Sequence, residues 1–93
     1  MKFLEIIQVR SHSGRSDYLF PLLKDLYQEG NGPDGLRGLK IYSHLQLKGD
    51  LSLHLVWEKD THDLLQGSPL GLKLSQALKD FGLINHNVWK EEE

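Results

Sequence analysis

Two histidines on either side of a short polar turn are the residues whose spacing could do chemistry. They are His44 and His54, in the stretch SHLQLKGDLSLHLVWE of residues 43–58. Apolar and polar side chains alternate on both sides of residues 48–50, which is typical of a β-hairpin. Because side chains alternate between the two faces of a sheet, only a loop of odd length sets leucine opposite leucine. With a loop of residues 48–50, the alternation predicts that His44 and His54 face one another.

An opposed pair of imidazoles could do several kinds of chemistry. Directly opposed Cβ atoms lie about 4.5–5.5 Å apart, close enough for two rings to share a metal ion, a water or an anion. A histidine also accepts a proton near neutral pH, so we predict His44 and His54 as catalytic residues. Tyr42 shares their face and His86 lies in the last predicted strand, and we predict both as ligand-binding residues. Two histidines are fewer ligands than a zinc site needs, so the sequence leaves open whether the pair binds a metal ion. It also leaves open the alternative that the two side chains only cover the surface of the sheet.

Composition excludes several classes of protein. The 93 residues make one predicted domain, residues 1–93, with 11 Lys and Arg against 13 Asp and Glu and a net charge of −2. No basic stripe is present, so we expect no nucleic-acid partner. Without cysteine there is neither a disulfide nor a thiolate metal site. Glu5 interrupts the apolar start and no segment approaches about 18 apolar residues, so we expect no membrane contact and a cytoplasmic location.

The apolar pattern predicts the element order β-α-β-β-α-β. Ser68 and Pro69 are a typical helix start, a capping hydroxyl followed by proline at the first position. The expected strands and helices occupy residues 2–10, 16–29, 36–47, 51–58, 69–81 and 83–90. This order is typical of an α+β, ferredoxin-like fold in which a four-stranded antiparallel sheet carries two helices on one face.

Such a fold leaves the other face of the sheet bare. A chain of this size buries only about 60–65% of its unfolded surface, so we expect a second copy to cover that face in a homodimer. The alternating leucines of residues 51–57 should pack on the helices, and Lys40, Tyr42 and His44 should then lie on the bare face.

Three stretches resemble the dimeric α+β barrel superfamily, and within it the antibiotic-biosynthesis-monooxygenase-like branch. They are GLRGLKIYSHLQ, LSLHLVWEKD and GSPLGLKLSQALKDFGLI. The resemblance implies a homodimer whose two sheets close into a barrel, with a cavity between sheet and helices in each subunit. It also implies that Trp57, which closes the third strand, lines that cavity as a ligand-binding residue. His54 then points the other way, unless a bulge near Val56 brings both to one face.

Members of this branch oxidise aromatic polyketides without a cofactor, degrade haem, or have no known activity. This chain has Gly67 where haem-degrading members carry a histidine, and no asparagine in its first strand, which argues against haem degradation. The resemblance implies a monooxygenase-like enzyme that needs no cofactor and acts on a small aromatic or quinonoid molecule. A non-catalytic ligand- or metal-binding module, and a dimerisation or interaction domain, are the alternatives.

Overall fold

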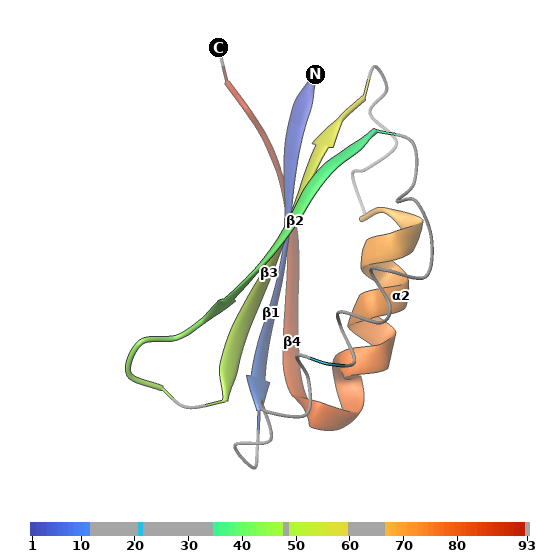
Figure 1. Cartoon of the computed structure of the whole chain (residues 1–93). Coiled ribbons are helices and arrows are strands. Elements are labelled where there is room, and N and C mark those ends of the chain that lie inside the picture. The colour runs from blue at the N-terminus through green and yellow to red at the C-terminus, as the bar shows by residue number, and fades with distance from the viewer. Residues whose placement is uncertain (12–20, 22–34, 48, 60–66, 93) are drawn as a thin grey trace.

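The computed structural model describes residues 1–11, 21, 35–47, 49–59 and 67–92, which contain a four-stranded antiparallel sheet and one helix (Figure 1). The strands are β1 (Lys2–Ser11), β2 (Leu36–Ser43), β3 (Asp50–Glu58) and β4 (Gly82–Lys90), in the spatial order β2-β3-β1-β4. Helix α2 (Pro69–Leu78) and the short 3₁₀ helix η1 (Lys79–Phe81) connect β3 to β4. The predicted ferredoxin-like α+β fold is confirmed. The helix expected at 16–29 lies outside the described residues, apart from Pro21.

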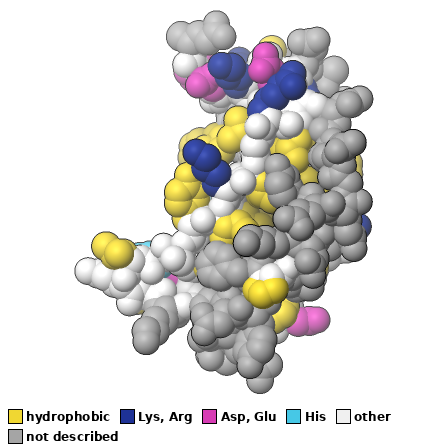
Figure 2. Space-filling model, in the orientation of Figure 1, with side chains coloured by type: hydrophobic (Ala, Val, Ile, Leu, Met, Phe, Trp, Pro, Cys, Tyr) yellow, Lys and Arg dark blue, Asp and Glu magenta, His cyan; other side chains and the backbone are white. Residues whose placement is uncertain are grey.

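One face of the sheet packs on α2 and holds the core. Strand β1 lies between β3 and β4 and has apolar side chains on both faces, which is typical of a central strand. The buried apolar side chains all come from the helix side of β1 and β3 and from α2: Phe3, Ile7, Val9, Leu51, Leu53, Leu55, Trp57, Leu74 and Leu78. The predicted leucine face is therefore confirmed. Figure 2 shows a band of hydrophobic side chains below the charged groups that gather at the end carrying both termini.

Helix α2 begins where the sequence predicts. The Ser68 hydroxyl accepts a hydrogen bond from the backbone N–H of Gly71 at 2.8 Å, and Pro69 follows the cap. Leu74 and Leu78 are buried, whereas Ala77, next to Leu78, is exposed. The buried side of the helix runs instead through Gly71 and Ser75, because a polar cluster lies beneath it.

The predicted register of the β2–β3 hairpin is wrong. Lys40 pairs with His54, and the backbone N–H of His44 donates to the carbonyl of Asp50 at 2.9 Å. The loop spans residues 44–49, so the β3 residues from Leu51 to Val56 face β2 residues four positions earlier than predicted. Because four is even, leucine still faces leucine. The faces are as predicted, but His44 and His54 are not opposed.

The side chain of His44 explains the longer loop. Its Nδ1 accepts hydrogen bonds from the backbone N–H groups of Gln46 and Leu47, both at 3.0 Å. Asparagine and aspartate side chains commonly accept backbone hydrogen bonds in turns in this way. Histidine is less often taken as a sign of a turn in a sequence. Gly49 completes the turn with φ +92°, a left-handed conformation that glycine adopts without strain. The only irregularity in the β2–β3 pairing follows Leu36 in β2, so a bulge near Val56 is not found in β3.

Candidate active site on the helix side of the sheet

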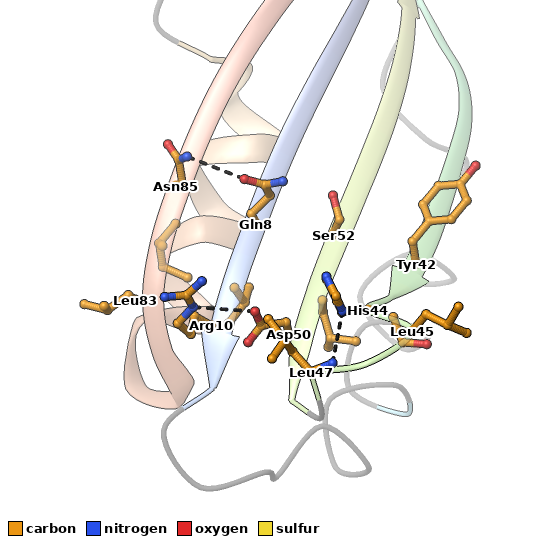
Figure 3. Close-up of a pocket in the computed structure, with 14 residues that line it drawn as sticks. Gln8, Arg10, Tyr42, His44, Leu45, Leu47, Asp50, Ser52, Leu83 and Asn85 are labelled. Carbon is orange, nitrogen blue, oxygen red and sulfur yellow. Dashed lines mark hydrogen bonds and ion pairs between the residues drawn. The ribbon is translucent and has the colours of Figure 1, made fainter.

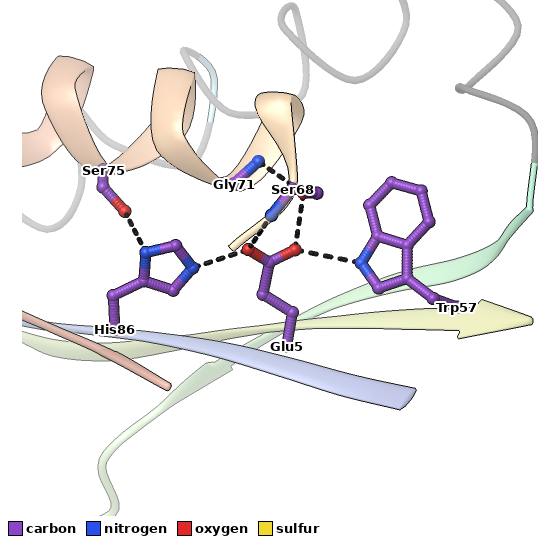
Figure 4. A network of polar contacts seen from close by, with 6 residues as sticks. All are labelled: Glu5, Trp57, Ser68, Gly71, Ser75 and His86. Atoms are coloured by element: carbon purple, nitrogen blue, oxygen red, sulfur yellow. Dashed lines mark hydrogen bonds and ion pairs between the residues drawn. The ribbon is translucent and has the colours of Figure 1, made fainter. Parts of the chain in front are cut away.

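A buried carboxylate lies at the centre of the helix side of the sheet (Figure 4). Strand alternation places Glu5 on the same face as Phe3 and Ile7, and its side chain is 0% exposed. Burying an ionised carboxylate costs several kcal/mol, on the order of a whole domain's margin of stability, unless hydrogen bonds replace its water. The surroundings of Glu5 therefore have to supply donors.

Four donors surround this carboxylate. Glu5 Oε1 accepts from the indole Nε1 of Trp57 at 2.9 Å and from the hydroxyl of Ser68 at 2.6 Å. Oε2 accepts from the backbone N–H of Ser68 at 2.9 Å and contacts Nε2 of His86 at 2.5 Å. An ionised carboxylate has about four acceptor positions and no donor, which matches this set. Among the described residues, no buried side-chain nitrogen or oxygen lacks a partner.

The four donors come from three different elements. Trp57 lies near the end of β3, Ser68 caps α2, and His86 lies in β4, so Glu5 in β1 connects the sheet to the helix. The amino end of α2 also presents the positive end of its dipole to the carboxylate.

Two glycines make room for the cluster. A Cβ atom at Gly71 would overlap the Glu5 carboxylate, and one at Gly67 would overlap the His86 ring. Gly67 also has φ +102°, where other residues are strained. The backbone before and inside α2 therefore approaches Glu5 as closely as it does because both positions lack a side chain.

The contact with Glu5 determines which nitrogen of His86 is basic. Because the carboxylate only accepts, Nε2 of His86 carries the proton and Nδ1 has the lone pair. The hydroxyl of Ser75 lies 3.4 Å from Nδ1, a long hydrogen bond, and the His86 side chain is 15% exposed. A carboxylate that holds an imidazole in one tautomer and stabilises its protonated form is a standard arrangement for a general base.

The five residues predicted from the sequence lie on two faces of the sheet. Trp57 and His86 are brought together on the helix side, where both bind Glu5. Tyr42 and His54 contact one another on the opposite face, with ring centroids 4.6 Å apart. His44 lies in the loop at one end of that face (Figure 3). Trp57 and His54 therefore lie on opposite faces, as the alternation predicts, and His86 lies apart from Tyr42 and His54. The catalytic and ligand-binding roles of the five residues stay predictions.

Sequence reasoning missed the centre of the cluster. In the sequence, Glu5 is only a break in an apolar stretch, and Ser68 is only a helix cap. The available signal was a charged residue on the inward face of a central strand, between Phe3 and Ile7.

Across the described ranges, no group of three or more His, Cys, Asp or Glu side chains is placed to hold a metal ion. No helix in the same ranges is long and apolar enough to cross a membrane.

Comparison with known proteins supports the fold. No family model and no curated protein matches the sequence. Three solved structures match over nearly their whole lengths. Rv0793 from Mycobacterium tuberculosis has a TM-score of 0.71 and 18% identity, covering 100% of this chain and 97% of that one. A conserved protein from Methanosarcina mazei Go1 has a TM-score of 0.75 and 14% identity, with 99% and 94% covered.

The third is a putative antibiotic biosynthesis monooxygenase from Bordetella bronchiseptica, with a TM-score of 0.71, 12% identity, and 99% and 98% covered. The likeness is one of fold. At the level of the fold, this likeness confirms the resemblance to the antibiotic-biosynthesis-monooxygenase-like branch. At these identities it does not extend to an activity.

Proposed function

We propose that this protein is a monooxygenase-like enzyme in which His86 takes a proton from a small aromatic or quinonoid substrate. The observation that carries the proposal is the buried Glu5–His86 pair, which leaves Nδ1 of His86 as the basic atom. An apolar residue in place of Glu5 would avoid the desolvation penalty of a buried charge, so stability alone does not account for a carboxylate in this strand. The name of the Bordetella bronchiseptica structure supports the same reaction class.

The reaction begins with proton transfer. Nδ1 of His86 accepts the proton of an acidic CH₂ group, displacing the long contact with Ser75, and Glu5 stabilises the imidazolium through Nε2. The substrate anion then reduces dioxygen. One oxygen atom forms a carbonyl at that carbon and the other leaves as water, so CH₂ and O₂ give C=O and H₂O. All the electrons come from the substrate.

Two copies of the chain form the active protein in this proposal. We call the face of the sheet opposite α2 the open face. One half of this face is apolar. Val56 and Trp89 flank Leu4 across three paired strands, and Val56 and Trp89 are 37% and 60% exposed. Apolar surface of this kind favours association. It also favours the second candidate function, a dimerisation or interaction domain. Light scattering should give a mass of twice 10.7 kDa for the wild type and a smaller one for Trp89→Ser.

Oxygen uptake tests the enzymatic proposal, with the anthrone dithranol as the probe. The wild-type protein should accelerate both oxygen consumption and anthraquinone formation. His86→Gln keeps an N–H for Glu5 but has no basic nitrogen, so the rate should fall about 100-fold. A wild-type rate no faster than that of heat-denatured protein, or an unchanged rate in a folded His86→Gln variant, would contradict the proposal.

The matched control is His54→Gln on the open face. The sheet separates His54 from Glu5 and His86, because Ile6 pairs with His54 and its side chain points away from that of Glu5. The rate should therefore stay within twofold of the wild type. A loss confined to His54→Gln would instead favour the sequence-based prediction that His44 and His54 are the catalytic residues.

A further inference from the structure

The open face carries a cavity of about 660 Å³ at the end where β2 and β3 are connected (Figure 3). Four polar side chains form a row across all four strands at its base. Gln8 pairs with Asn85 on one side and Ser52 on the other, and Ser52 pairs with Tyr42. The cavity is thus built on regular sheet and not on loops alone.

Hydrogen-bond directions make this cavity rich in donors. The amide of Asn87 donates to Asn85 at 3.2 Å, and Asn85 donates to Oε1 of Gln8 at 3.5 Å. This chain of hydrogen bonds ends at Gln8, whose NH₂ group is then presented to the cavity. Nδ1 of His44 accepts two backbone hydrogen bonds, so the neutral ring carries its proton on Nε2 and donates there.

A cation and an apolar rim complete the site. Arg10 lies beside Gln8 in the cavity wall and contacts Asp50 through Nε at 3.5 Å. A guanidinium has five N–H groups, so one contact through Nε leaves donors for a ligand. Leu45, Leu47 and Leu83 also line the cavity and are 99%, 48% and 64% exposed.

We infer that this cavity binds a small organic carboxylate. The carboxylate accepts hydrogen bonds from Arg10, Gln8 and His44, and the apolar body of the ligand covers the exposed leucines. Charge-assisted bonds from arginine to carboxylate are the strongest available here. This site is separate from the Glu5 cluster, and the inference does not rest on the proposed enzymatic function.

A ligand suits this end of the face better than a second copy does. Packing another sheet here would desolvate Arg10, Asp50 and the amide row, which costs free energy unless each group finds a new partner. The apolar half around Leu4 and Trp89 carries no such penalty. The two halves of the open face therefore differ in what they can bind.

Titration of ¹⁵N-labelled protein with benzoate tests the inference. The side-chain NH₂ signals of Gln8 and Asn85 should shift and saturate, and benzamide, which has the same shape without the charge, should bind at least about tenfold more weakly. Arg10→Gln should weaken benzoate binding about tenfold. Arg37→Gln is the matched control, because Arg37 is similarly exposed and contacts Glu58 at 3.6 Å but lies outside the cavity.

Four results would overturn the inference. One is the absence of saturable shifts at Gln8 and Asn85. Equal binding of benzamide and benzoate is the second, and equal loss of benzoate binding in Arg10→Gln and Arg37→Gln is the third; either would leave no specific carboxylate contact. The fourth is a response confined to the indole N–H of Trp57, which would place benzoate at the Glu5 cluster instead.

Discussion

The two faces of one sheet hold their polar side chains in different ways. On the helix side, the buried Glu5 carboxylate has four partners from Trp57, Ser68 and His86 at 2.5–2.9 Å. On the open face, Gln8 and Asn85 are exposed and joined by a bond of 3.5 Å. The first face fixes one arrangement of groups, whereas the second presents groups that a ligand can engage without disrupting the fold.

The two sets of side chains differ because those on the helix side are buried at low dielectric, whereas those on the open face are in contact with water. A buried hydrogen bond that loses its partner leaves a desolvated group, and the penalty is much larger than the net contribution of the bond itself. An exposed group that loses its partner binds water instead. Substitutions should therefore have large effects on the helix side and small effects on the open face.

The largest effect is expected for Glu5→Ala. It leaves the N–H groups of Trp57, Ser68 and His86 without their acceptor, and removing one member of a buried charged network costs about 3–5 kcal/mol. Urea unfolding followed by circular dichroism measures the loss. Gln8→Ala on the exposed side of the same strand is the control and should change stability by less than about 0.5 kcal/mol. Equal losses in the two variants would remove the distinction between the faces.

A smaller loss is expected for Gly71→Ala. Alanine normally stabilises a helix by about 1 kcal/mol relative to glycine, but here its Cβ overlaps the Glu5 carboxylate. We expect a net loss of about 1–3 kcal/mol from overpacking. Gly38→Ala in β2 is the matched control, because a Cβ atom added at Gly38 would have nothing within 4 Å. A gain in stability in Gly71→Ala would mean that the helix does not approach Glu5 this closely.

The smallest effect is expected for His54→Ala on the open face. The ring contacts Tyr42 at a tilt of 49° and lies 3.0 Å from the Ser52 hydroxyl, a partly exposed arrangement. A double-mutant cycle with Tyr42→Ala should give a coupling free energy of about 0.5 kcal/mol. A coupling of about 2 kcal/mol or more, far above the roughly 0.2–1 kcal/mol of cross-strand pairs, would show that the open face also holds a tightly coupled cluster.

Sequence reasoning worked where periodicity decides structure. The leucines of β3 lie on the helix side and Ser68 caps α2 as predicted. Alternation determines only which face a residue occupies, however, and the hairpin slipped by an even number of positions that alternation cannot detect. The length of that loop depends on a side-chain hydrogen bond to His44, which no periodic pattern contains.

The candidate site was harder to predict for a related reason. Glu5 and His86 are 81 positions apart in the chain, and only the antiparallel pairing of β1 with both β3 and β4 brings Trp57 and His86 to the Glu5 carboxylate. Spacing along one strand gives no information on such a contact. A charged residue on the inward face of a central strand is the one local feature that indicates it.

The protonation of His86 tests the central claim most directly. Long-range ¹H–¹⁵N spectra of selectively labelled His86 report which ring nitrogen carries a proton. We predict that the neutral ring carries its proton on Nε2, which faces the Glu5 carboxylate, and has its lone pair on Nδ1. A neutral ring with its proton on Nδ1 would contradict this, because Glu5 would then be the donor and His86 would have no basic nitrogen directed away from the carboxylate.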